Sequence, residues 1–274
     1  MPQLQDSIAD AFAVNVKSVT AFYSALLEQE FRDLDDYHEG SIPIWSSRSG
    51  PLIQEAQLTV MDMANAIIDM QLGILLDGEY STDYPDPSIV TGPGIRNGSS
   101  ITDVYGRVFK PVWQGLGDGL PLDTAIHHGI ERLKSMFDVD IERVIDHVSI
   151  ERFANEHKLV GYRRVLTGSR NCALCILAST QVYHKRQLKG IHPNCKCKVL
   201  PVTSFEDISK TLRQDLIDEV HASIKERLGS FDKSGRAIDY RKVLFVREHG
   251  ELGPILTFRN HHFTGPKGLK TPGE

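Results

Sequence analysis

The chain has 274 residues, of which 41% are hydrophobic and 24% are charged, and its formal net charge at pH 7 is −5. This composition excludes wholesale disorder and supplies enough apolar residues for a core. No basic region precedes an apolar stretch at the start, and no apolar run approaches the roughly 18 residues of a membrane helix, so we expect folding in a reducing cytosol.

The N-terminal part is predicted to form two helices, over residues 5–36 and 52–76. Apolar residues on the second helix recur at intervals of three and four, which is typical of a packed helical seam. These residues are Ile53, Ala56, Val60, Met63, Ile67, Met70 and Ile74. The first helix offers a matching face of Phe12, Val16, Val19, Tyr23 and Leu26. A turn-rich link between the helices predicts an antiparallel pair.

Residues 77–100 are rich in Gly, Pro, Ser and Asp, which indicates a linker. Ser100 and Asp103 then form a capping box that predicts a helix as far as about Trp113. Two further helices are predicted over 122–137 and 141–156, followed by a strand in "LVGYRRVLTGS". Beyond the cysteines, a helix is predicted over 203–229, and "RKVLFVREHG" with "GPILTFRN" predicts a β-hairpin.

All four cysteines lie within one short stretch, as Cys172-x2-Cys175 and Cys195-x-Cys197. Two such pairs can supply the tetrahedral thiolate ligands of a structural zinc ion, with His192 as a possible substitute ligand. Two other interpretations stay open, namely four reduced cysteines in a small core and disulfides formed later. A redox C-x2-C motif fits poorly because no βαβ pattern surrounds it.

The cysteines lie in a strongly basic stretch. Residues 158–205 contain nine Lys and Arg residues and no Asp or Glu, so the remainder of the chain carries a net charge of −14. This pattern indicates either a solvated basic face or a surface for nucleic acid or an acidic protein. Besides Lys158, the candidate binding residues are Arg163, Arg164, Arg170, Lys185, Arg186, Lys189, Lys196 and Lys198.

Catalytic motifs give no support for an enzyme. The sequence contains no G-x-S-x-G nucleophile elbow, no H-E-x-x-H and no P-loop. A zinc ion held by four cysteines has no open coordination position, which favours a structural role for the metal. We therefore expect no catalytic residues.

Several motifs occur in a specific order: C-x2-C, Y-H, H-P-x-C-x-C and H-G-E-x-G-P. They lie in "GYRRVLTGSRNCALCILASTQVYH", "IHPNCKCKVLPV" and "VREHGELGPILTFRNHHFTGP", and "VYGRVFKPVW" and "EVHASIKERL" accompany them. Over roughly residues 100–266 the chain thereby resembles the Mu F-like minor head proteins of tailed bacteriophages, in the form carried by phages of actinobacteria.

The resemblance implies a head-morphogenesis role. The expected protein is a low-copy minor capsid component of the virion, at the portal vertex or in the capsid interior, assembled in the host cytoplasm. Its expected partners are the portal protein, the major capsid protein or both, and possibly packaged DNA, without a membrane or a small-molecule substrate. The alternatives are a capsid maturation protease and a nucleic-acid-binding head protein.

The expected fold is mainly α. It comprises an N-terminal helical hairpin (1–76), a Gly/Pro-rich linker (77–100) and the helical part of the Mu F-like domain (101–157). A small α+β module that is basic, rich in cysteine and zinc-binding follows (158–204), then a C-terminal helix with a β-hairpin (205–266) and a tail (267–274). We refer to residues 158–204 as the Cys-rich module.

Overall fold

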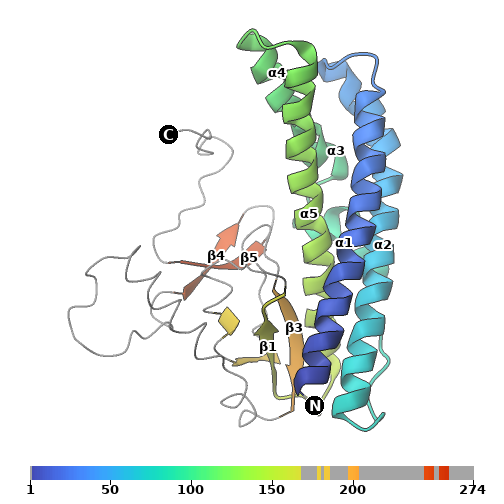
Figure 1. The fold of residues 1–274 in the computed structure, drawn as a ribbon, viewed down its shortest axis with the longest axis vertical. Helices are drawn as coiled ribbons and strands as arrows, with labels where there is room; N and C mark the ends of the chain where they lie inside the picture. The colour runs from blue at the N-terminus through green and yellow to red at the C-terminus, as the bar shows by residue number, and fades with distance from the viewer. Residues whose placement is uncertain are drawn as a thin grey trace, which may run out of the picture.

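The computed structural model describes residues 2–167, 178–179, 182–185, 197–203, 244–249 and 253–258. This part of the chain is mainly helical and carries a small three-stranded antiparallel sheet. Three long helices lie side by side as a bundle, with the sheet at the end of the bundle that holds the N-terminus (Figure 1). The long helices are α1 (Pro2–Arg32), α2 (Ile42–Leu75) and α5 (Leu122–Asn155).

The sheet places β1 (Gly161–Val165) between β2 (Val182–His184) and β3 (Lys198–Val202), with both pairings antiparallel. β3 is buried along its whole length and packs against α1, α2 and α5. The predicted C-terminal hairpin is confirmed, because β4 (Leu244–His249) pairs with β5 (Gly253–Phe258) in antiparallel register.

One hydrophobic core joins the bundle to the sheet. It contains side chains of α1, α2, α5 and the connecting helices, together with Tyr162 of β1 and Val199 of β3. Phe31, Trp45 and Phe109 meet edge to face in this core, at centroid distances of 5.1 and 5.3 Å from Phe31. The N-terminal helices therefore share their core with the rest of the described chain.

The buried face of α2 departs from the predicted heptad seam. Ile53, Ala56 and Val60 are fully buried as predicted, but Met70 is 55% exposed. Burial passes instead to Met61, Ala64, Ile68 and Leu72. A straight helix has 3.6 residues per turn, so a strict 3.5-residue stripe rotates by about 20° per heptad away from a fixed neighbour.

Helix α2 begins ten residues before the predicted start and runs through Pro51. The predicted link between the first two helices is wrong on this point, since only residues 33–41 connect them. Pro51 removes one main-chain hydrogen bond from the helix. Trp45, Ser49 and Ile53 recur every four residues and are each fully buried, so their packing offsets that loss.

By length and composition alone, the helical stretch Glu39–Leu75 is apolar enough to cross a membrane. This differs from the expectation that no apolar run is long enough to do so. The buried side chains of α2 pack against α1 and α5, as in the core helix of a helical bundle.

The segment between α2 and α3 belongs to the core. It forms two short 3₁₀ helices, η2 (Pro87–Ile89) and η3 (Gly92–Arg96), and buries Val90, Ile95 and Arg96. The predicted capping box is confirmed, because Ser100 Oγ accepts a hydrogen bond of 3.0 Å from the Asp103 amide. The helix that it starts, α3 (Ile101–Tyr105), continues through η4 (Gly106–Val108) into α4 (Phe109–Gly117).

The two helices predicted over 122–137 and 141–156 form one continuous helix, α5. No proline or glycine separates the two predicted parts. Val139 and Ile141 are both buried, so the core covers the proposed junction, and Asp140 between them is only 1% exposed. The buried Asp140 therefore contacts polar groups of other elements, namely Arg96 of η3 and Tyr105 of α3.

Candidate functional site

The structure describes some of the candidate site residues and not others. Those described are Cys197, Arg163, Arg164, Lys185 and Lys198, as is Lys158. The candidates that lie outside the described residues are Cys172, Cys175, Cys195, His192, Arg170, Arg186, Lys189 and Lys196. The predicted helix over 203–229 also lies almost entirely outside them.

Cys197 lies directly before β3 and is buried, with 5% of its surface exposed. Arg164 of the neighbouring strand β1 is equally enclosed, and its Nη1 lies 3.4 Å from Cys197 Sγ. A guanidinium that donates to sulfur favours the thiolate, which is the form that binds a metal. The surroundings of Cys197 thus fit a zinc thiolate.

The described residues alone do not complete a metal site. Within them, no three His, Cys, Asp or Glu side chains are grouped so that they could hold an ion. Four thiolates with one Zn²⁺ carry a net charge of about −2, and a buried cation such as Arg164 would offset part of it. The fit of zinc therefore depends on the cysteine spacing and on the cationic neighbour of Cys197.

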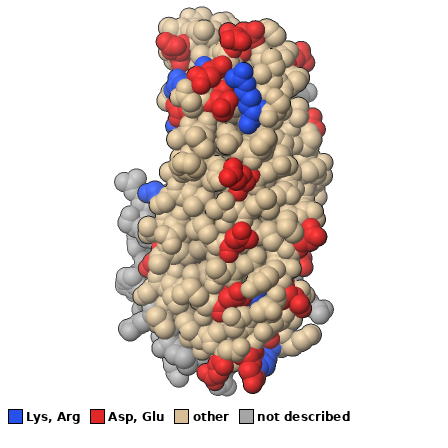
Figure 2. Space-filling view, turned by 90° about the vertical axis from the view of Figure 1, so that its right-hand side faces the viewer, with Lys and Arg blue, Asp and Glu red and all other residues tan. Residues whose placement is uncertain are grey.

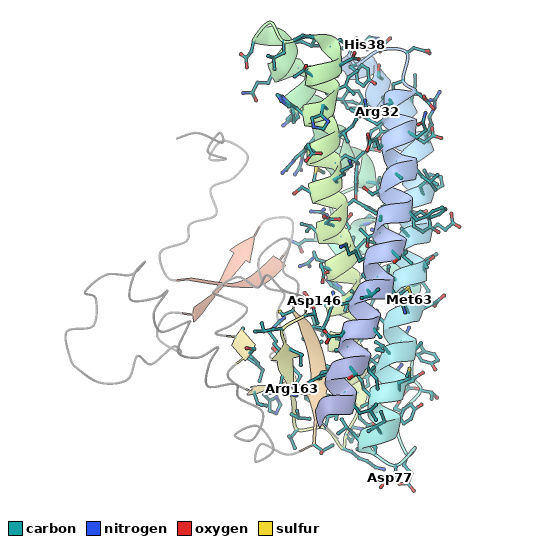
Figure 3. All side chains as sticks on the ribbon, viewed as in Figure 1. Arg32, His38, Met63, Asp77, Asp146 and Arg163 are labelled. Carbon is teal, nitrogen blue, oxygen red and sulfur yellow. The ribbon has the colours of Figure 1, made fainter. Side chains whose placement is uncertain are left out.

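Next to Cys197, Lys198 faces the bundle. Its Nζ lies 2.8 and 2.9 Å from the two carboxylate oxygens of Glu142 on α5. One turn further along α5 stands Asp146, close to the junction between the helix and the sheet (Figure 3). Burial raises the pKa of Glu142 and of Asp146, while Lys198 and Arg164 respectively act in the opposite direction. We call Arg164, Cys197, Lys198, Glu142 and Asp146 the junction cluster.

Three other basic residues of the Cys-rich module also contact the helical part. Arg163 Nη2 lies 2.6 Å from Asp6 Oδ1 on α1 (Figure 3 labels Arg163). Lys158 Nζ lies 2.9 Å from Glu79 Oε2, in the segment that follows α2. Lys185 Nζ donates to the carbonyl oxygen of Glu156 at 2.6 Å. These side chains attach the module to the bundle at several points.

A further polar cluster lies where α2 and α5 approach the sheet. The buried Arg152 donates to Asp69 at 2.5 Å, to Asn65 at 3.3 Å and to the carbonyl of Ser81 at 3.1 Å. Its guanidinium also lies 4.8 Å from the ring centroid of Tyr84. These bonds hold the chain after α2 against α5.

Sequence reasoning missed a buried network in the middle of the bundle. Arg96 forms an ion pair with Asp140, and Tyr105 donates to the same carboxylate at 2.6 Å. Arg96 also donates to the carbonyl of Met136 at 2.8 Å. Asp140 shares a helix face with Met136 and Val144, and that spacing is the one signal that marks it as buried.

A small cavity lies between α1, α2, α5 and β3, lined by Phe12, Gln71, Ser149 and Lys198 among others. It has room for about one water molecule. Seven of its ten lining residues are apolar. Two of the polar ones are bonded within the protein, Ser149 to the carbonyl of Ile145 and Lys198 to Glu142, which is typical of a structural junction.

Comparison of the chain with family models, with curated proteins and with solved structures gives no match.

Proposed function

We propose that this chain is a minor head protein of a tailed bacteriophage, a structural component whose Cys-rich module binds one zinc ion. The head assignment rests on the resemblance of its ordered cysteine and histidine motifs to the Mu F-like proteins. The structural role rests on the geometry of the junction cluster. No enzymatic step is part of the proposal.

The observation that carries the structural role is the attachment of the module to the bundle. Lys198 pairs with Glu142 and Arg163 pairs with Asp6, so β3 and β1 are tied to two different helices. Charged groups that are committed to such pairs position one part of a protein on another and are less available to an external phosphate. This favours a scaffold over a DNA-binding surface for the described basic residues.

Zinc would hold the module together from within. When bound, the ion would cross-link Cys172, Cys175, Cys195 and Cys197, and the protein would contribute Arg164 as a donor to the Cys197 sulfur. Because such a site forms only when the module folds, the free energy of zinc binding contributes to the folding free energy. The bundle would then carry a rigid module at one end.

Two observations test the assignment as a head protein. In the genome that encodes the chain, we expect genes for a portal protein and a major capsid protein beside its gene. When the chain is co-expressed with those two proteins, we expect it to co-sediment with the particles that form. A chain that stays in the soluble fraction while particles form would contradict the proposal. Cleavage of the major capsid protein that depends on this chain would support the maturation protease instead.

A further inference from the structure

The outer sides of α1 and α2 expose a concentration of large apolar side chains. Of the eleven such exposed side chains in the described residues, seven lie on these two helices. They are Leu4, Val14, Phe22, Leu26, Ile44, Leu58 and Met70. Val14 and Phe22 are 64% and 60% exposed, so most of each side chain lies in water. An apolar surface that recurs along two long helices is a feature of interaction sites.

The exposed side of α1 has the spacing of a second helical seam. Its residues recur at intervals of three and four from Leu4 to Ala25, all are exposed and none is charged. They are Leu4, Ser7, Ala11, Val14, Ser18, Ala21 and Ala25. The opposite side of α1 buries Phe12, Val16, Tyr23 and Leu27 in the core. A partner that matches this spacing is itself an α-helix.

The charges around this surface are mostly acidic. Residues 2–27 of α1 and 49–75 of α2 contain five acidic residues and one basic residue, Lys17. The acidic residues are Asp6, Asp10, Glu55, Asp62 and Asp69. Two of them form intramolecular ion pairs, Asp6 with Arg163 and Asp69 with Arg152. Figure 2 looks onto this side and shows a largely uncharged surface on which acidic groups are spread along the length.

Two exposed acidic residues of α2 lie at the same height along the bundle as the exposed apolar residues of α1. The ring of Phe31 lies 5.1 Å from that of Trp45, which fixes the register of the antiparallel helices. Each step back along α1 is matched by a step forward along α2 because both rise by about 1.5 Å per residue. By this register Phe22 is level with Gln54, one residue before Glu55, and Val14 is level with Asp62. Glu55 and Asp62 are both exposed. We call Val14, Phe22, Glu55 and Asp62, with the α1 seam, the outer hairpin face.

We infer that the outer hairpin face binds an amphipathic α-helix of a partner protein, whose apolar stripe is flanked by lysines or arginines. The chain's own predicted helix over 203–229 fits less well, because it contains six acidic and four basic residues. A second copy of the chain would bring the same acidic residues against this face. The inference goes beyond the proposed function and does not depend on zinc.

The experiment measures binding of synthetic peptides to the full chain by fluorescence anisotropy. One peptide of about 21 residues carries leucines at three- and four-residue spacing flanked by lysines, and a second replaces every lysine by glutamate. We expect the basic peptide to bind and the acidic one to bind at least about tenfold more weakly. Val14→Ser/Phe22→Ser should weaken binding of the basic peptide by about tenfold or more.

Two further variants test whether binding depends on the acidic charges and on this particular surface. Glu55→Lys/Asp62→Lys should weaken binding of the basic peptide and strengthen binding of the acidic one, because it reverses the exposed charge at the height of the seam. Leu116→Ser/Leu122→Ser, which changes exposed leucines at the other end of the molecule, should leave the affinity unchanged within about twofold. Circular dichroism checks that every variant keeps its helical content.

The inference would be overturned by results showing that this face binds something other than a basic helix. Equal binding of both peptides, or an affinity unchanged in Val14→Ser/Phe22→Ser, would show that this face is not a basic-helix site. A dimer in sedimentation velocity that this variant abolishes would assign the face to a second copy. A photo-cross-link from position 22 to residues 203–229 would assign it to the chain itself, and variant-sensitive pelleting with phosphatidylcholine vesicles would assign it to lipid.

Discussion

Lys198 on β3 and Glu142 on α5 form a two-pronged ion pair, with the ammonium nitrogen 2.8 and 2.9 Å from the two carboxylate oxygens. The Lys198 side chain is only 6% exposed, and the residue before it is Cys197. The pair therefore fixes the position of a proposed metal ligand relative to the helical bundle. A change in this pair should affect the stability of both parts.

Loss of the ammonium in Lys198→Met should lower the free energy of unfolding by about 2–4 kcal/mol, since it leaves the Glu142 carboxylate without its partner. Urea denaturation followed by tryptophan fluorescence, to which the buried Trp45 contributes, measures this change. Lys198→Met/Glu142→Leu should recover much of the loss because no unpaired charge remains. A single variant as stable as the unchanged protein would contradict the importance of this pair.

His147 on α5 should make the protein less stable in mild acid. Burial, aided by the neighbouring Arg143, lowers its pKa from 6.5 to about 4, and its Nε2 lies 3.0 Å from Arg143 Nη2. Because the unfolded chain binds the proton more readily, the stability contributed by neutral His147 is present above pH 6.5. It is lost as the pH falls to about 4, by up to about 3 kcal/mol.

The control for this pH dependence is His147→Gln, which cannot take up the proton. The raised pKa values of Asp140, Glu142 and Asp146 give a slope of the opposite sign, so the difference between the two proteins isolates the histidine. In denaturation curves measured between pH 7 and pH 4, the unchanged protein should lose up to about 3 kcal/mol of stability relative to His147→Gln. Parallel curves would mean that His147 does not titrate in this range.

The early start of α2 can be tested at Trp45. Trp45→Ala should cost about 3–5 kcal/mol, because it empties a fully buried site and removes the hydrogen bond of 3.2 Å from Nε1 to the carbonyl of Tyr105. Ile44→Ala should cost less than about 1 kcal/mol, since Ile44 is 51% exposed. Thermal unfolding by circular dichroism compares them. Equal losses would show that this turn of α2 is not packed as described.

The rotation of the buried face of α2 predicts a graded series of aspartate substitutions. Ala64→Asp should unfold the bundle or cost more than about 4 kcal/mol, because the site is fully buried. Met63→Asp, at a half-buried position, should cost less, and Met70→Asp should cost less than about 0.5 kcal/mol. The order of the three midpoints in urea is the measurement. A strict heptad seam would instead make Met63→Asp and Met70→Asp the most damaging.

Short sequence patterns predicted some elements of the fold correctly and placed the bounds of others wrongly. The capping box at Ser100, the strand β1 and the hairpin of β4 and β5 depend on short stretches of sequence, and all three occur. The start of α2 and the continuity of α5 depend on burial by distant residues. Local patterns placed a turn near Pro51 and a break near Asp140, and tertiary packing overrides both.

For the candidate site, too, local patterns identify some residues, whereas contacts between distant residues are not predicted. Cysteine spacing identifies possible ligands, and Cys197 is found buried beside a cation. The pairings of Lys198 with Glu142 and of Arg163 with Asp6 join residues far apart in the chain. A single sequence gives no signal for such pairs, so a basic stretch is indistinguishable from a solvated surface until the acidic partners on α1 and α5 are known.

The most direct test of the central claim is the metal content of the purified chain, measured by elemental analysis together with thiol titration under denaturing conditions. A structural zinc site predicts about one zinc per chain, and Cys197→Ser should reduce the zinc affinity sharply because it removes a ligand. A chain without metal, in which Cys172, Cys175, Cys195 and Cys197 all titrate as free thiols, would contradict the claim.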